Sequence, residues 1–340
     1  MRRVRLSLAA TLAATLMLAA AACGGDDKES STDEAAPKGT GQGAVLSSTW
    51  PLTGLPVSGD QSAEQSHPVF IVKIDNTSSS SPQIGLGDAD MVVEELVEGG
   101  STRLAAFFYS KIPANAGPVR SMRASDIGIV KPVDGQMVTS GAAGVTIRRL
   151  QGAGVKFYGE GSKGMYRDNA RSAPYNLFVK LQDLAKTVKV DEARPADYLP
   201  WGDAKDLPKG QPAKTIAASF SGGHTTDWVF RGGTYENTNS NAAAGDKFLA
   251  DSVLVLRVKV GDAGYRDPAG NPVPETHFTG TGKAMLFHDG RLVRGTWSKH
   301  GLNSALKLKT KAGALEVPAG HTFIELVPTG NGGNVTFTRK

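Results

Sequence analysis

Cysteine is almost absent from this chain of 340 residues, in which Cys23 is the only one. A single cysteine cannot form an internal disulfide, and the six histidines show none of the close spacings that a zinc site requires. We therefore expect no metal and no cofactor. An excess of one charge is also lacking, because 38 basic and 33 acidic residues leave a formal net charge of +5. So small an excess does not indicate a nucleic-acid partner.

Long hydrophobic runs are confined to the N-terminus. Arg2, Arg3 and Arg5 precede an apolar run over residues 6–22, which ends in small residues that include Ala20, Ala21 and Ala22. A transmembrane helix needs about 20 apolar residues with polar flanks on both sides, and this run is shorter and ends in small residues. Residues 1–22 are therefore predicted to be an export signal.

Cys23 directly follows these alanines, a pattern that resembles a bacterial lipobox, in which the cysteine becomes the lipidated first residue of the mature protein. Ala20 stands where that pattern most often has leucine. We predict lipidation of Cys23, with a secreted soluble protein as the alternative. Because no second hydrophobic span follows, we expect anchoring at the outer face of the cell membrane. Residues 23–48 would form the lipidated cysteine and a disordered tether, since they are rich in small and acidic residues without periodicity.

The residues that follow predict two domains. With 41 glycines and 18 prolines, an all-helical protein is excluded, and the length allows two cores. Residues 49–205 read as an α/β or α+β domain. Its predicted strands are 69–74, 91–97 (with a short helix as the alternative), 102–109 and 136–139, and its predicted helices are a short one after Ser125 or Asp126, 145–150, and 176–188 with Asn176 as cap.

A proline-rich segment between Arg194 and Pro212 is predicted to be the domain boundary. Residues 213–340 then read as a β-rich domain, with Asp289-Gly290 as a hairpin turn. Its predicted strands are 215–220, 227–231, 252–260, 284–288, 292–297 and 322–327.

Several motifs, in order along the chain, are similar to those of the YerB-like family of bacterial lipoproteins. They are PLTGLP at 51–56, KIDN at 73–76, EELVEGG at 94–100 with TR at 102–103, GPVRS at 117–121 with Arg123, RD at 167–168 with RSAP at 171–174 and Asn176, GTGKA at 280–284, DG at 289–290, GTW at 295–297, and VP at 327–328. The resemblance implies a lipid-anchored extracytoplasmic protein with an N-terminal and a C-terminal domain, both of unknown function. The chain departs from the family pattern at Ser81, Tyr175 and Asp251.

Arginines cluster in the glycine-rich and proline-broken segments of the first predicted domain. Arginine presents a planar fork that matches carboxylate or phosphate oxygens, and loops on a rigid scaffold are where such forks converge. The sequence therefore predicts a site for an anionic ligand. The alternative is that nearby acids pair with these arginines and the cluster is structural. The predicted ligand-binding residues are Arg103, Arg120, Arg123, Arg167, Arg171, Asn176, Asp75 and Glu94.

Three catalytic motifs are only partly present. Residues 159–164 satisfy GxGxxG, but no helix pattern follows to hold a dinucleotide. Residues 280–283 resemble part of a phosphate-binding loop without its first glycine, and we expect both segments to be turns. Ser140 lacks the spacing of a nucleophile elbow and is better explained as a turn and helix cap.

The interpretation that follows is a non-catalytic envelope lipoprotein. Its arginine site would bind an anionic ligand, an envelope polymer or a protein partner, and no nucleic acid. The alternative is an enzyme acting on a phosphorylated envelope substrate, with Asp75 or a glutamate as base or metal ligand. A purely structural role in an assembly is the third possibility.

Overall fold

The computed structural model describes residues 48–339. The predicted signal peptide, Cys23 and nearly all of the predicted tether lie outside the described residues. No helix within the described range is long and apolar enough to cross a membrane.

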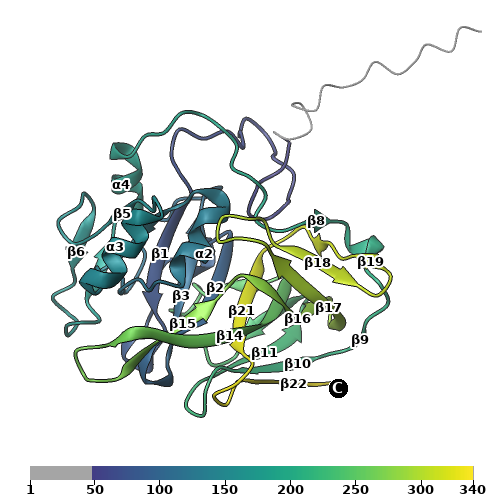
Figure 1. Ribbon diagram of the computed structural model, residues 1–340. Coiled ribbons are helices and arrows are strands. Elements are labelled where there is room, and N and C mark those ends of the chain that lie inside the picture. The colour runs from purple at the N-terminus through teal and green to yellow at the C-terminus, as the bar shows by residue number, and fades with distance from the viewer. Residues whose placement is uncertain (1–47, 340) are drawn as a thin grey trace, which may run out of the picture. The chain divides into compact units, whose positions relative to one another are not determined.

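The largest element is a sheet of thirteen strands (Figure 1). β2 pairs with β21 in parallel, so strands from both predicted domains belong to one continuous sheet. Its main path runs through β19 (Gly313–Ala314), β18 (Lys307–Thr310), β17 (Arg291–Lys299), β16 (Gly280–His288), β14 (Ser252–Arg266), β21 (Thr322–Pro328), β2 (Met91–Leu96), β3 (Thr102–Phe108), β1 (Phe70–Asp75), β4 (Gln136–Val138) and β5 (Phe157–Tyr158), while β15 (Pro272–His277) pairs with β14 and β9 (Gln211–Pro212) with β17.

The central strands are buried on both faces, which explains their nearly unbroken apolar sequences. Every residue of β1, β2 and β3 is buried. The β2–β3 hairpin is confirmed, and the alternative of a helix at 91–97 is wrong. Gly99 and Gly100 in its turn have φ values of 71° and 74°, a left-handed conformation that favours glycine.

Each face of the sheet covers its own hydrophobic core. Val93 and Phe107 belong to one core, and their neighbours Val92 and Phe108 belong to the other, as strand alternation requires. The second core is closed by a five-stranded sheet, whose Trp228 packs edge-on against Phe323 of β21. This sheet has the order β13 (Leu249–Ala250), β12 (Thr234–Asn237), β11 (Thr225–Arg231), β10 (Thr215–Ser219) and β22 (Asn334–Thr338).

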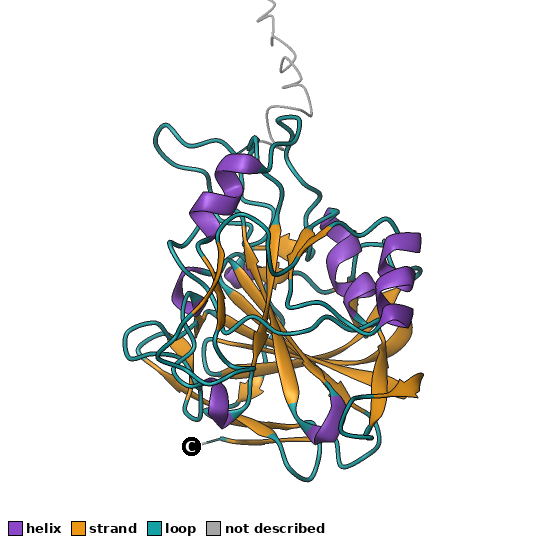
Figure 2. Cartoon of the chain, turned by 90° about the vertical axis from the view of Figure 1, so that its left-hand side faces the viewer, coloured by secondary structure: helices purple, strands orange, loops and turns teal. Residues whose placement is uncertain are grey.

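Figure 2 shows that strands dominate and that the helices are short. The three described α-helices are α2 (Asp126–Val130), α3 (Gly144–Gly152) and α4 (Leu181–Thr187), and all precede β9. The prediction of a β-rich C-terminal part is confirmed. The remaining elements are β6 (Met165–Arg167) paired with β7 (Leu177–Val179), β8 (Trp201–Gly202) paired with β20 (Val317–Pro318), and the 3-10 turns η1 (Ser78–Ser80), η2 (Leu86–Asp88), η3 (Glu98–Gly100), η4 (Lys131–Val133) and η5 (Ala204–Asp206).

Some local predictions are wrong. Asn176 does not cap a helix, because β7 follows it and α4 begins only at Leu181. The buried residues of β7 pair with β6, and this pairing overrides their helix-like spacing. Ser140 is not a helix cap, since Ala143 precedes α3. Residues 280–283 begin strand β16 and do not form a turn, whereas 159–164 do form turns, with β6 following them in place of a helix.

Candidate functional site

The GPVRSMR segment, residues 117–123, lies along the end of β1. The backbone N–H of Arg120 donates to the carbonyl of Lys73 at 2.8 Å, and that of Asp75 donates to the carbonyl of Pro118 at 3.1 Å. A Cβ at Gly117 would lie 2.7 Å from the Phe178 ring, so the start of the segment packs closely against β7. The segment thereby carries its arginines to the face of the sheet that bears Asp75 and Arg103, which are paired in register.

The innermost part of this face is a buried ion group. Lys73 Nζ lies 2.5 Å from Glu95 Oε1 and 2.7 Å from Asp126 Oδ1, and all three side chains are fully buried. Burial raises the pKa of Glu95 to about 7, against the opposing attraction of Lys73. Because one lysine faces two carboxyl groups, the group favours a protonated Glu95 below about pH 7.

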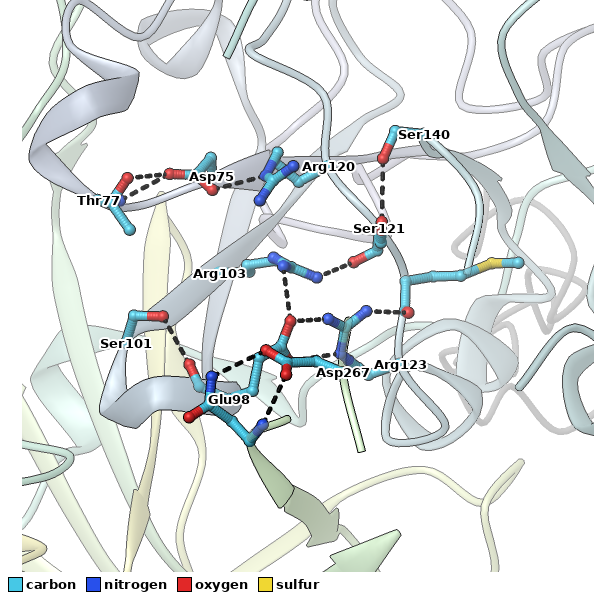
Figure 3. A network of polar contacts seen from close by, with 12 residues as sticks. Asp75, Thr77, Glu98, Ser101, Arg103, Arg120, Ser121, Arg123, Ser140 and Asp267 are labelled. Atoms are coloured by element: carbon cyan, nitrogen blue, oxygen red, sulfur yellow. Dashed lines mark hydrogen bonds and ion pairs between the residues drawn. The ribbon is translucent and has the colours of Figure 1, made fainter. Parts of the chain in front are cut away.

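Glu98 forms ion pairs with both Arg103 and Arg123, next to this buried ion group (Figure 3). Its Oε1 accepts hydrogen bonds from Arg123 Nη2 and, at 3.0 Å, from Arg103 Nη2, while Oε2 accepts one from Arg123 Nε at 2.8 Å. Although burial opposes ionisation, the Arg123 hydrogen bond and the Arg103 charge hold the pKa of Glu98 below its ordinary value. Burial and the charge of Arg123 lower the pKa of Arg103 to about 10, so this guanidinium stays charged at neutral pH.

Arg120 forms the outer layer of the cluster. Its Nε donates to Asp75 Oδ2 at 2.8 Å, and its guanidinium carbon lies 5.4 Å from the centre of the Tyr175 ring. Asp75 Oδ1 accepts hydrogen bonds from the backbone N and the hydroxyl of Thr77, at 2.9 and 2.5 Å. No described residue accepts a hydrogen bond from either terminal nitrogen of Arg120. We call Arg103, Arg120 and Arg123, with Asp75 and Glu98, the arginine cluster.

An open cavity of about 330 Å³ adjoins the arginine cluster. Ser121, Arg123 and Ser140 line one side, with the Ser121 and Ser140 hydroxyl oxygens 3.1 Å apart. Residues 265–268, at the end of β14, line the other side. Tyr265 is hydrogen-bonded to Thr146 of α3 at 2.8 Å, which positions this wall. The cavity is therefore built from both halves of the chain.

Arg167, Arg171 and Asn176 lie outside the arginine cluster. Arg167 donates to both carboxylate oxygens of Glu160 at 2.6 Å and to Asn176 Oδ1 at 2.7 Å. Arg171 is ion-paired with Asp168 and donates to the carbonyls of Ser80 and Pro82. Within residues 48–339, no hydrogen bond or ion pair links these three to the cluster.

Glu94 faces away from Glu95, as adjacent strand residues must, and is fully buried. It accepts hydrogen bonds from Asn76, Thr102 and Thr226, and its Oε1 lies 2.9 Å from His224 Nε2. Burial opposes its ionisation, but His224 holds the pKa of Glu94 below its ordinary value. Its register partner Glu325 has a pKa raised well above the ordinary range by burial and by the Glu94 charge. This second polar network joins β2, β11 and β21.

Sequence reasoning did not include Glu98, Ser121 or His224 among the site residues. Glu98 follows β2 in the predicted hairpin turn, so the hairpin signal alone places it near Arg103, its ion-pair partner. Ser121 stands between the two arginines of the GPVRSMR segment. His224 reaches Glu94 across 130 residues of chain, and no local pattern indicates that contact.

Two models of one family of unknown function match this chain. Residues 52–194 match the family model described as "Protein of unknown function (DUF3048) N-terminal domain", and residues 216–324 match that of its C-terminal domain. The chain therefore belongs to this family, and the predicted resemblance is confirmed.

Among known proteins, the chain is similar to "Putative lipoprotein YerB" of Bacillus subtilis (strain 168). The two are 22% identical over 293 residues, which cover 82% of this chain and 86% of the relative. The crystal structure of YerB superposes with a TM-score of 0.69 at 19% identity, covering 85% of this chain and 99% of that structure. At this identity the structural match supports the fold alone.

Proposed function

We propose that this protein is a lipoprotein anchored through Cys23 to the outer face of the cell membrane, and that its arginine cluster binds an anionic group of an envelope polymer or partner protein. The anchoring rests on the residues before and around Cys23 and on the name of the Bacillus subtilis relative. The binding role rests on the contacts within the cluster.

The unused hydrogen-bonding capacity of Arg120 is the observation that carries the proposal. Its Nε and Asp75 fix the guanidinium in place, while both terminal nitrogens remain available for a bidentate contact with a carboxylate or phosphate. The cluster itself holds three arginines against the two carboxylates Asp75 and Glu98, a net positive charge that favours an anion, while Arg266 and Asp267 line the adjoining cavity. The nearby hydroxyls of Ser121 and Ser140 offer two further donors.

Binding is favoured over catalysis because the carboxylates of the cluster are already engaged. Both oxygens of Asp75 and both of Glu98 accept hydrogen bonds from neighbouring donors. A general base requires a carboxylate free to take a proton from a substrate. The contacts of Asp75 and Glu98 are better suited to holding the arginines in position.

Thermal unfolding of the chain from residue 23 onward, with Cys23→Ser, tests the binding proposal. The probes are inorganic phosphate, glycerol 3-phosphate and acetate. At ~100-fold saturation, a ligand of the folded state stabilises by about 2.7 kcal/mol, which corresponds to roughly 5 °C in melting temperature for a body of this size.

We expect the gain to disappear in Arg120→Gln and to persist in Arg167→Gln, an arginine of the same half that lies outside the cluster. If no probe stabilises the parent, or if Arg167→Gln loses the effect equally, the proposed anion site is wrong.

The lipid anchor at Cys23 is tested separately by cell fractionation. Cys23→Ala should move the protein from the membrane to the soluble fraction.

A further inference from the structure

A second, more strongly charged surface lies on the C-terminal strands, away from the arginine cluster. Along one face of β14, Val253 and Val255 are buried beneath the five-stranded sheet. Two residues further on, the same face carries Arg257 and then Lys259, because side chains alternate along a strand. The covering sheet thus leaves this part of the large sheet open to solvent.

Strand register aligns basic and hydroxyl side chains in two rows, the first across four strands and the second across three. In the first row Lys309 of β18 lies opposite Thr296, and Thr296 opposite Lys283 of β16. Arg257 completes this row, since its neighbour Leu256 pairs with Ala284. The second row contains Lys307, Ser298 and Thr281 of β18, β17 and β16. Lys259 pairs with His277 of β15 and lines the same cavity as Thr281. The first row spans about 14 Å at the usual strand spacing.

Three adjoining cavities form a continuous groove over these rows. The first, of about 350 Å³, is lined by Arg257, Lys283 and Arg294. The second, of about 390 Å³, shares Arg257 and Lys283 with the first, and the third, of about 440 Å³, shares Thr281 with the second. Val335 of β22 lines the first cavity and so forms a wall of the groove. We call this surface the basic groove. Its cavities are lined by Arg257, Lys259, Lys283, Arg294 and Lys307, and Lys309 lies beside them in the first row.

The positive charge of the basic groove is not balanced within the described protein. No aspartate or glutamate lines the three cavities. Lys259, Lys283, Lys307 and Lys309 have no ion pair or hydrogen bond to the side chain of another described residue, and the guanidinium of Arg294 lies over the Phe337 ring. Arg257 donates only to the carbonyls of Pro328 and Gly333. Like charges held this close repel one another unless an anionic partner neutralises them.

We propose that the basic groove binds a linear polyanion with repeated phosphate groups. A linear chain fits better than a lipid bilayer, because cations line each of the three adjoining cavities instead of standing on a flat surface. The rows combine cations with hydroxyl groups, which together can hold successive phosphates. The groove shares no residue with the arginine cluster, so this proposal is independent of the function proposed above.

The test measures the affinity of the chain from residue 23 onward, with Cys23→Ser, for long-chain inorganic polyphosphate over a series of salt concentrations. The groove variant is Lys259→Ala/Lys283→Ala/Lys309→Ala. The control variant is Lys156→Ala/Lys186→Ala/Lys205→Ala, which removes the same charge from exposed lysines elsewhere. The substituted lysines of both variants are exposed, so melting temperatures should stay near that of the parent.

We expect the groove variant to lose at least tenfold in affinity for polyphosphate at low salt. The slope of log affinity against log salt concentration should become shallower by about two, because three phosphate contacts are lost. The control variant should bind polyphosphate as the parent does. Equal losses in both triple variants would mean attraction by net charge alone and would overturn the proposal. Stronger binding to polyglutamate, or binding to anionic phospholipid vesicles without binding to polyphosphate, would overturn it as well.

Discussion

Glu95→Gln should stabilise this protein at alkaline pH, although Glu95 forms an ion pair with Lys73 2.5 Å away. The side chain is fully buried, and two carboxyl groups share the one lysine. Its pKa of about 7 in the folded state compares with 4.5 for an ordinary glutamate. The folded protein therefore holds a proton that the unfolded chain releases at a lower pH.

The sign of the effect follows from proton linkage. A carboxyl group whose pKa is raised by folding does not lower the free energy of unfolding below about pH 4.5, because it is protonated in both the folded and the unfolded state. Between pH 4.5 and about 7 the unfolded chain loses the proton first, so the free energy of unfolding falls as the pH rises. At pH 8 the accumulated loss is about 3 kcal/mol. Glutamine remains neutral at every pH and avoids this loss.

Urea unfolding of the parent and Glu95→Gln at pH 5, 6, 7 and 8 measures the effect. We expect the variant to match the parent near pH 5 and to exceed it by up to ~3 kcal/mol at pH 8. A variant that is clearly less stable than the parent at pH 8 would refute the reasoning, because Glu95 would then be an ionised partner that Lys73 requires.

Glu98→Gln provides a matched control, since the same substitution should act in the opposite direction. Glu98 neutralises Arg103 and Arg123, whose side chains are only 6% and 8% exposed. Removing one partner of such a buried group typically costs ~3–5 kcal/mol. Because folding lowers the pKa of Glu98, its contribution is present above about pH 4.5 and is lost as the pH falls.

Two further predictions concern the network around Glu94. Glu94 raises the pKa of His224 against the opposing effect of burial, so the stability from this pair is present below pH 6.5 and is lost as the pH rises. His224→Gln should remove that part of the pH dependence in urea unfolding, and an unchanged profile would contradict it. Trp228→Phe removes the 2.8 Å hydrogen bond from Nε1 to buried Glu325 and should cost ~1–3 kcal/mol. A loss below 0.5 kcal/mol by the same measurement would show that Glu325 finds another donor.

The arginine cluster shows how far local sequence could predict a site. Arg120 and Arg123 were identified because glycine and proline break the chain before them. Arg103 was identified because it follows a glycine-rich turn. Arg167 has the same kind of surroundings, yet it lies outside the cluster and pairs with Glu160. A loop pattern indicates that a side chain is free to reach a ligand, but it does not indicate which loops meet.

The amino-acid sequence by itself determined most of the long strands, the hairpin turns, the β-rich C-terminal part and the family. These features depend on alternation, on turn residues and on ordered motifs, all of which are local in the chain. Only the tertiary structure decided that β2 pairs with β21, that Leu177–Val179 forms a strand, and that Glu94 meets His224. The tertiary structure also determined the basic groove, because four strands must pair in register before their basic side chains lie on one face of the sheet. Such contacts depend on pairing between segments far apart in sequence, and no pattern within one segment encodes them.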